Sequence, residues 1–218
     1  MRELTYCQAL NEALHQLLEN DERVILIGQG VWSPWYVGNT CNGLLDRFGK
    51  DRIVDTPVSE NGVTGMAVGM AISGLKPIMI FPRHDFVLYA ADPIINQAAK
   101  WSYMSAGRSN ASLVYILIIN RGNCQGPQHS QDFTFIFEGI PGLKVTSPKT
   151  PYDVKGAIIA AVQDPNPVIF IDNRDRYGIE GEVPEEMYSL PDLIKDNEGC
   201  PIPTSEPLEK LYFERYGR

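Results

Sequence analysis

Residues 53–77 read Ile-Val-Asp-Thr-Pro-Val-Ser-Glu-Asn-Gly-Val-Thr-Gly-Met-Ala-Val-Gly-Met-Ala-Ile-Ser-Gly-Leu-Lys-Pro, and the rest of the chain can be placed around them. The first two residues end an apolar run that is typical of a buried strand. Ser59 is a residue type favoured at a helix N-cap, so we expect a helix that begins at Glu60 and ends at Gly74. A glycine inside a helix costs about 1 kcal/mol relative to alanine, so three glycines within this one predict that another helix or a flat ligand packs very close.

Glu60 has two interpretations on these residues alone. A carboxylate in the first turn of a helix is stabilised by the positive end of the helix dipole, and the glycines could serve helix packing only. Alternatively, the carboxylate is fixed at the mouth of a tightly packed helix and orients a ligand there.

Composition narrows the class of protein. A chain of 218 residues suits one domain with or without a tail, and 44% hydrophobic residues are enough for a core. The formal charge of -8 and the pI of about 4.9 argue against non-specific binding to nucleic acid or to an anionic membrane surface. No apolar run is long enough for a membrane span and residues 1–6 lack an apolar signal core, so we expect a cytoplasmic protein. The cysteines form no Cys-x-x-Cys pair, so free thiols are expected and a zinc site is not: Cys7, Cys41, Cys124 and Cys200.

Apolar runs alternate with segments of helical spacing along the chain. Strands are expected at 24–27, 53–54, 77–81, 113–119, 143–146 and 168–171, and helices at 6–19, 43–48, 60–74, 85–101 and 151–162. Strands that are apolar throughout and alternate with helices predict an α/β fold, a mainly parallel sheet with helices on both faces. We expect this domain to cover residues 1–172. Residues 173–218 are expected to form an irregular tail that packs on the domain or on a partner, with one helical turn at 208–213.

Ligands of such folds bind at the carboxyl ends of the strands. Gln29, Glu60, Phe86 and His129 all follow predicted strands, so one site can collect them. The aromatic loop 32–36 could be a lid over that site or an interface patch.

The order of residues in several blocks closely resembles the beta subunit of thiamine-diphosphate-dependent 2-oxoacid dehydrogenases, a family related to transketolase. The central block is Asp55-Thr-Pro-Val-Ser-Glu-Asn-Gly62, then Gly65-Met-Ala-Val-Gly-Met-Ala71 and Gly74-Leu-Lys-Pro77. Further blocks at family spacing are 92–100, 129–131, 141–145, 147–148, 151–156 and 164–168. The resemblance runs from about residue 4 to 186 and implies the pyrimidine-binding domain of that family.

The resemblance assigns roles to the candidate residues. Glu60 would hydrogen-bond the N1′ nitrogen of the aminopyrimidine ring of thiamine and so help the cofactor lose the proton from its thiazolium carbon. His129 would face the substrate and stabilise a carboxylate or oxyanion, or pass a proton. Phe86 would stack on the aminopyrimidine, although a core phenylalanine is an equal alternative. Ala161, Asp164 and Asn166 match a segment that in some relatives binds a structural potassium ion through backbone carbonyls.

Two segments depart from the family pattern. Gly28-Gln29-Gly30 stands where the family has Gly-Glu-Asp or Gly-Glu-Glu, so an acid near the cofactor has become neutral. Pro82-Arg-His-Asp85 stands where the family reads Gln-Phe-Ala-Asp. Arg83 or His84 could contact an anionic substrate, such as a phosphate, but we expect both to be exposed.

The resemblance also implies partners. The 218 residues contain no Gly-Asp-Gly followed by a metal-ligating Asn, the motif that holds magnesium and the diphosphate in this superfamily. An alpha-type subunit that carries this motif is therefore expected, in an α2β2 heterotetramer. The C-terminal domain of the family's beta subunit is not found in these 218 residues, and we expect it either to be a separate chain or to be lost.

Three functions remain open at this point. The first is the pyrimidine-binding subunit of an enzyme that activates a 2-oxo acid or ketose, by decarboxylation and acyl or aldehyde transfer. Within this class, a 2-oxoacid dehydrogenase competes with the second function, that of a transketolase-like or carboligating enzyme. The third is a non-catalytic subunit for assembly or regulation, which the change at Gln29 favours. A Rossmann-type dehydrogenase is set aside because no Gly-x-Gly-x-x-Gly follows the first predicted strand.

Overall fold

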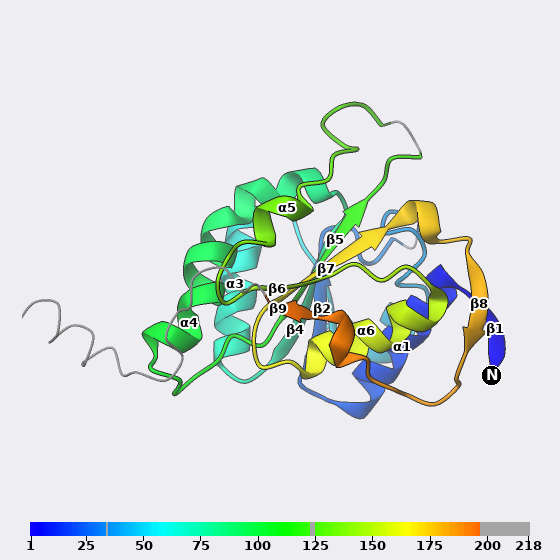
Figure 1. The fold of residues 1–218 in the computed structure, drawn as a ribbon, viewed down its shortest axis with the longest axis horizontal. Helices are drawn as coiled ribbons and strands as arrows, with labels where there is room; N and C mark the ends of the chain where they lie inside the picture. The colour runs from blue at the N-terminus through cyan, green and yellow to red at the C-terminus, as the bar shows by residue number, and fades with distance from the viewer. Residues whose placement is uncertain (34, 123–124, 197–218) are drawn as a thin grey trace, which may run out of the picture.

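The computed structural model describes residues 1–33, 35–122 and 125–196 (Figure 1). A seven-stranded sheet in the order β3-β2-β4-β5-β7-β6-β9 runs through its centre, with six parallel strands and an antiparallel β9 at one edge. Its strands are β2 (Val24–Gly28), β3 (Ile53–Asp55), β4 (Lys76–Phe81), β5 (Val114–Ile119), β6 (Lys144–Thr146), β7 (Val168–Asn173) and β9 (Lys195–Asp196). The predicted parallel sheet is confirmed.

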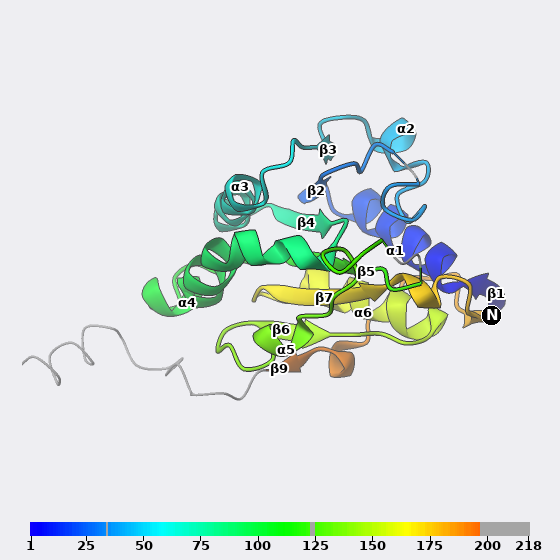
Figure 2. The ribbon, with the colours of Figure 1, turned by 90° about the horizontal axis from the view of Figure 1, so that it is seen from above.

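Helices cover both faces of this sheet, as predicted (Figure 2). The α-helices are α1 (Tyr6–Asn20), α2 (Leu44–Phe48), α3 (Glu60–Ile72), α4 (Ala99–Met104), α5 (Thr134–Phe137) and α6 (Pro151–Gln163). Shorter 3₁₀ and π segments are η1 (His84–Ala90), η2 (Asp92–Ala98), η3 (Arg174–Arg176) and η4 (Pro191–Leu193). In Figure 2, α3 and α4 lie on one side of the sheet and α1 and α6 on the other.

The two faces of the sheet bury two separate hydrophobic cores. Along β4, Ile78 and Ile80 pack with α1 and α6, whereas Met79 and Phe81 pack with α3 and the η1–η2 segment. This division follows from the period of two residues in a strand. Because both faces are covered, the central strands are apolar throughout, and all six residues of β5 are buried.

Two helices begin with a reciprocal pair of hydrogen bonds between side chain and backbone. The Thr5 hydroxyl accepts the backbone N–H of Gln8, and the Gln8 side chain accepts the backbone N–H of Thr5. Thr150 and Asp153 form the same reciprocal pair at the start of α6. Such a capping box satisfies N–H groups that have no partner within the helix.

The helix expected at 85–101 is divided into η1, η2 and α4. Pro93 lies at the start of the π segment η2. Proline lacks the N–H of the regular ladder and its ring clashes with the carbonyl four residues earlier, so a regular α-helix is disfavoured here. The η1 and η2 parts of this segment pack along α3. The helix type changes along the segment from 3₁₀ to π and then to α.

Residues 174–196 are more regular than the expected tail. The strands β1 (Arg2–Thr5) and β8 (Glu180–Val183) form a two-stranded antiparallel sheet. Farther on, the Leu190 N–H donates to the Gly156 carbonyl at 3.1 Å, and β9 pairs with β6. The described part of this segment therefore packs on the domain. The helical turn expected at 208–213 lies outside the described residues, as do Cys124 and Cys200.

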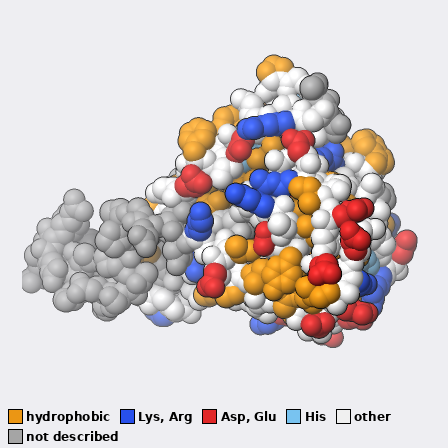
Figure 3. All heavy atoms as spheres, turned by 45° about the vertical axis from the view of Figure 1, so that its right-hand side comes forward, with side chains coloured by type: hydrophobic (Ala, Val, Ile, Leu, Met, Phe, Trp, Pro, Cys, Tyr) orange, Lys and Arg blue, Asp and Glu red, His pale blue; other side chains and the backbone are white. Residues whose placement is uncertain are grey.

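The surface of the domain is mixed in character. In the space-filling view of Figure 3, acidic, basic and hydrophobic side chains are interspersed on the face that is turned forward. Within the described residues, no helix combines the length and the apolar character needed to cross a membrane.

Candidate functional site

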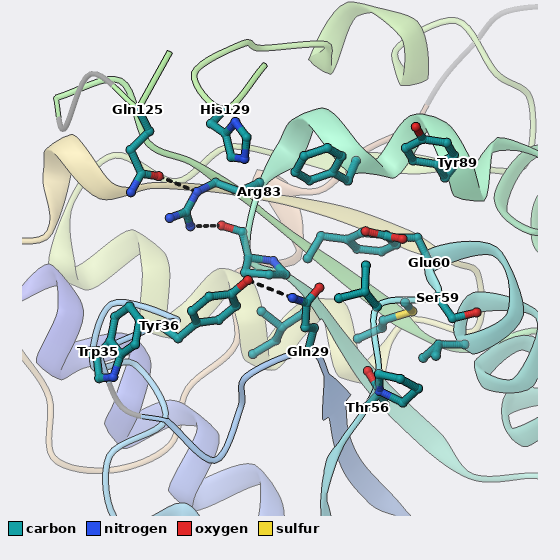
Figure 4. A pocket seen from close by; sticks show the side chains of 18 residues that line it. Gln29, Trp35, Tyr36, Thr56, Ser59, Glu60, Arg83, Tyr89, Gln125 and His129 are labelled. Carbon is teal, nitrogen blue, oxygen red and sulfur yellow. Dashed lines mark hydrogen bonds between the residues drawn. The ribbon is translucent and has the colours of Figure 1, made fainter. Parts of the chain in front are cut away.

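A cavity of about 720 Å³ opens at the carboxyl ends of β2 and β4, beside the start of α3 (Figure 4). This size is ordinary for a pocket that binds a small molecule or cofactor. The lining combines aliphatic and aromatic side chains with a few polar ones: Gln29, Trp35, Tyr36, Glu60, Val63, Met79, Arg83, Phe86, Tyr89, Gln125 and His129. All four residues that the strand ends were expected to bring together, Gln29, Glu60, Phe86 and His129, lie in this lining.

Glu60 is the first residue of α3 and is half-buried. Its backbone carbonyl accepts the Thr64 hydroxyl at 2.6 Å, which anchors the first turn. Its carboxylate has no hydrogen-bond partner among the described residues and lines the pocket, so it is available to a ligand. Ser59 occupies the N-cap position, as predicted, but its side chain makes no capping hydrogen bond.

Hydrogen bonds to Asp55 connect the carboxyl ends of β2 and β3 next to Gln29. One carboxylate oxygen of Asp55 accepts the backbone N–H groups of Gly30 at 2.6 Å and Thr56 at 2.9 Å. The Gln29 side chain amide then donates to the Tyr36 hydroxyl at 2.8 Å. This bond holds the aromatic loop against the pocket, so the neutral side chain at position 29 has a structural contact.

Two described residues of the aromatic loop 32–36 lie in the wall of the pocket. Trp35 and Tyr36 line the cavity, and Trp35 is 71% exposed. Trp32 instead donates its indole N–H to the Ile53 carbonyl at 2.8 Å, which fixes the loop to β3. The loop is thus part of the pocket wall.

Phe86 and His129 form an aromatic corner. Their ring centroids are 5.2 Å apart, with the rings nearly perpendicular. Phe86 also stacks with Tyr89, with the ring centroids 6.4 Å apart. An edge-to-face pair of this kind fixes the orientation of both rings. The rings of Phe86 and His129 therefore form one preorganised part of the pocket wall.

Arg83 and His84 are not exposed, which makes the expectation for both wrong. Arg83 is half-buried and lines the pocket, and burial lowers the pKa of its guanidinium. His84 is fully buried next to Phe133 and Phe137, outside the pocket lining. Burial lowers the pKa of His84 to about 4. Arg83 faces the pocket and His84 faces the core because the 3₁₀ segment η1 begins at His84, directly after Arg83.

The residues of the expected potassium segment are not in the pocket. Ala161 lies near the end of α6, and Asp164 and Asn166 lie in the loop at the amino end of β7, whereas the pocket lies at the carboxyl ends of β2 and β4. The Asp164 carboxylate accepts Lys144 Nζ at 2.9 Å and the Asn166 N–H at 2.8 Å, and its backbone carbonyl accepts the Ser112 hydroxyl at 2.6 Å. Within residues 1–33, 35–122 and 125–196, no group of three or more His, Cys, Asp or Glu side chains could hold a metal ion.

No described residue packs closely against the glycine face of α3. A side chain carbon added at Gly65 or Gly69 would meet no described atom within 4 Å, and one at Gly62 would meet only Ser59. The close neighbour that the glycines predict is therefore not supplied by the described residues.

Among the pocket residues that sequence reasoning missed are Gln125, Tyr89 and Met79. Gln125 follows β5 in the same loop as His129, so its position after a strand was the available signal. Tyr89 and Met79 carry no motif, and their place in the lining depends on how η1 and β4 pack against α3.

Comparison with known proteins identifies the fold family. Residues 2–180 match the family described as "Transketolase, pyrimidine binding domain". The chain is 44% identical over 186 residues to the mitochondrial pyruvate dehydrogenase E1 component subunit beta of Saccharomyces cerevisiae, covering 85% of this chain and 51% of that protein. It is 39% identical over 217 residues to the acetoin:2,6-dichlorophenolindophenol oxidoreductase subunit beta of Cupriavidus necator, covering 93% of this chain and 64% of that protein.

A solved structure gives the same fold. A split gene transketolase, described as an inactive beta4 tetramer, superimposes with a TM-score of 0.66 at 15% identity, over 86% of this chain and 57% of that one. The chain thus spans about half to two thirds of the length of these relatives. On the match over residues 2–180, the chain belongs to the transketolase pyrimidine-binding domain family.

Proposed function

We propose that this chain is the pyrimidine-binding subunit of a thiamine-diphosphate-dependent enzyme that acts on a 2-oxo acid. The observation that carries the proposal is that Glu60, Phe86 and His129 line one pocket. The relatives named as beta subunits of pyruvate dehydrogenase and of an acetoin oxidoreductase support the class of reaction. A transketolase-like or carboligating activity belongs to the same proposal, because the same pocket residues would serve it.

The pocket fits the pyrimidine half of the cofactor. A flat, partly polar ring needs an apolar wall and one group that recognises a ring nitrogen. Phe86, Val63 and Met79 supply the wall, and the unpartnered carboxylate of Glu60 supplies the polar group. Bound thiamine diphosphate supplies a carbon nucleophile, which amino acid side chains lack.

The chain's own residues would position the cofactor and handle protons. Glu60 would share a proton with the N1′ nitrogen of the pyrimidine through a hydrogen bond, and the positive end of the α3 dipole would favour the carboxylate form of Glu60 when the proton lies on the ring. Phe86 would fix the plane of the ring. His129, packed against Phe86, would donate to the oxygen of the substrate on which negative charge develops.

The proposal includes a partner. An alpha-type subunit that carries a Gly-Asp-Gly motif would hold the diphosphate and magnesium, in an α2β2 heterotetramer. The open glycine face of α3 supports the contact of this chain with another protein. A potassium ion near Ala161, Asp164 and Asn166 stays a prediction; Lys144 already places a positive charge beside the Asp164 carboxylate.

Co-purification tests this proposal. The full chain is co-expressed with the product of the gene beside its own that encodes a Gly-Asp-Gly motif, and the purified complex is examined by mass spectrometry. We expect both chains and thiamine diphosphate to be recovered together. A stable complex that binds no thiamine diphosphate would refute the proposal.

A second candidate function is a non-catalytic subunit for assembly or regulation. The observation that favours it is Gln29, which is neutral and is held by Tyr36. Such a subunit would form the complex, but turnover would not depend on Glu60.

A further inference from the structure

Arg83 places a positive charge in the pocket. Figure 4 shows its side chain beside His129 and Gln125, across the pocket from Glu60. Arg83 Nε donates to the Gln125 side chain oxygen at 2.7 Å, and a terminal nitrogen donates to the Pro82 carbonyl. Both acceptors are neutral, so these bonds hold the guanidinium in place without balancing its charge.

Among the described residues no carboxylate forms a salt bridge with Arg83, although the charge of Asp85 offsets part of the effect of burial on the pKa of Arg83. Asp85, the nearest acid in the sequence, accepts the backbone N–H of Gln131 at 3.2 Å and its side chain amide at 2.8 Å. The neighbouring cation Arg174 is bound to the carbonyls of the aromatic loop, and its charge adds to the effect of burial in lowering the pKa of Arg83. A half-buried guanidinium that lacks a salt bridge and lies near a second guanidinium would be stabilised by a bound anion.

The guanidinium is preorganised for such an anion. The Gln125 and Pro82 contacts fix its orientation, and its carbon lies 6.0 Å from the centre of the Tyr36 ring. Tyr36 is itself held by Gln29. A planar guanidinium presents paired N–H donors that match the two oxygens of a carboxylate or phosphate.

We propose that Arg83 binds an oxyanion of the substrate, a carboxylate or a phosphate, at the end of the pocket opposite Glu60. Arg83 would then be a specificity-determining residue that restricts substrates to those with a negative group at this end. The inference rests on the proposed function, because it assumes that the pocket between Glu60 and Arg83 receives cofactor and substrate together. It goes further by assigning the substrate's charged group to a residue of this chain.

Calorimetric titration of the full chain with inorganic phosphate and with succinate tests the oxyanion site without cofactor. Binding is compared for the unaltered chain, Arg83→Gln, Arg83→Lys and the control Arg108→Gln; Arg108 is exposed, and its Nε donates to the Ser105 carbonyl outside the pocket. We expect Arg83→Gln to weaken binding about tenfold or more, because charge-assisted hydrogen bonds are lost. Arg83→Lys should keep part of the affinity, and Arg108→Gln should keep all of it. The probe that binds more tightly identifies the source of the oxyanion as phosphate or carboxylate.

Equal affinity of Arg83→Gln and the unaltered chain would overturn the inference, and so would the absence of saturable binding of either probe. Thermal unfolding of each variant shows whether the fold is kept. In the complex with its partner, we expect Arg83→Gln to raise the KM of the anionic substrate and to leave thiamine diphosphate affinity unchanged. A complex that lacks cofactor would refute the proposed function, whereas the phosphate and succinate titrations would still decide the role of Arg83.

Discussion

His84 is a fully buried titratable residue whose environment is largely apolar. Phe133 and Phe137 lie beside its ring, and neither ring nitrogen has a hydrogen-bond partner among the described residues. Burial lowers its pKa to about 4, although the charges of Asp132 and Asp85 act in the opposite direction and Arg121 adds to the lowering. The imidazole is therefore neutral in the folded protein at neutral pH.

This pKa predicts a loss of stability in acid. An unfolded histidine has a pKa of about 6.5, so between pH 6.5 and 4 the unfolded chain binds a proton that the folded chain does not, and stability falls by up to about 1.4 kcal/mol per pH unit. We expect His84→Leu to reduce the slope of unfolding free energy against pH in this window, as measured by urea denaturation. His15→Leu serves as the control for removing a histidine elsewhere. An unchanged slope in His84→Leu would contradict this role.

Part of the candidate site could be predicted from the positions of residues after strands. Glu60, Phe86 and His129 were placed together because parallel strands end at one edge of the sheet. The environment of Arg83 and His84 could not be predicted, because Pro-Arg-His-Asp has the polar composition of an exposed loop. Only the packing of η1 against α3 and β4 decides which side chain enters the pocket and which enters the core.

At the scale of elements, close approaches between segments depend on single glycines. Gly142, just before β6, has a φ of 88°, and a side chain carbon there would lie 1.9 Å from the Ala99 carbonyl oxygen. Gly139, three residues earlier, has open space around it and a φ outside the left-handed region. The two glycines form a matched pair in one loop.

We expect Gly142→Ala to lower the free energy of unfolding by roughly 1–3 kcal/mol, because the alanine meets both backbone strain and a clash. Gly139→Ala should stay close to the unaltered chain. Thermal and denaturant unfolding of both variants measure the difference. Equal stabilities would mean that the loop before β6 adjusts without cost.

Apolar strands could be predicted from the sequence, and short polar strands could not. The strands β2, β4, β5 and β7 are continuous apolar runs, which identified them. The strands β1, β8 and β9 have two to four residues each and pair with distant parts of the chain or sheet, so no local pattern marks them. The capping boxes at Thr5 and Thr150, in contrast, involve only residues three positions apart, so the local sequence is enough to form them.

At the scale of the whole molecule, the glycine face of α3 is open although it lies beside the candidate site. Gly65 and Gly69 are exposed, and so are Met66 and Tyr89 nearby. Helix glycines are unfavourable unless close packing requires them. We therefore interpret this face as the contact with another protein chain.

Gly65→Leu tests this interpretation. Leucine is the better helix former and has space in the isolated chain, so we expect the stability of the chain to be unchanged or raised by up to about 1 kcal/mol. Assembly with the partner, measured by size-exclusion chromatography with light scattering, should be lost. Gln163→Leu, at the exposed end of α6, is the control that should assemble normally. Normal assembly of Gly65→Leu would exclude close packing on this face.

The central claim is that Glu60 handles the proton at the pyrimidine ring of thiamine diphosphate. Its most direct test is the rate of 2-oxo acid decarboxylation by the complex, with the acids screened in parallel, for the unaltered chain, Glu60→Gln and the exposed control Glu22→Gln. The account predicts a loss of about 100-fold or more for Glu60→Gln with the complex still assembled, and full activity for Glu22→Gln. Unchanged turnover in Glu60→Gln would contradict the catalytic assignment and favour a subunit that serves assembly alone.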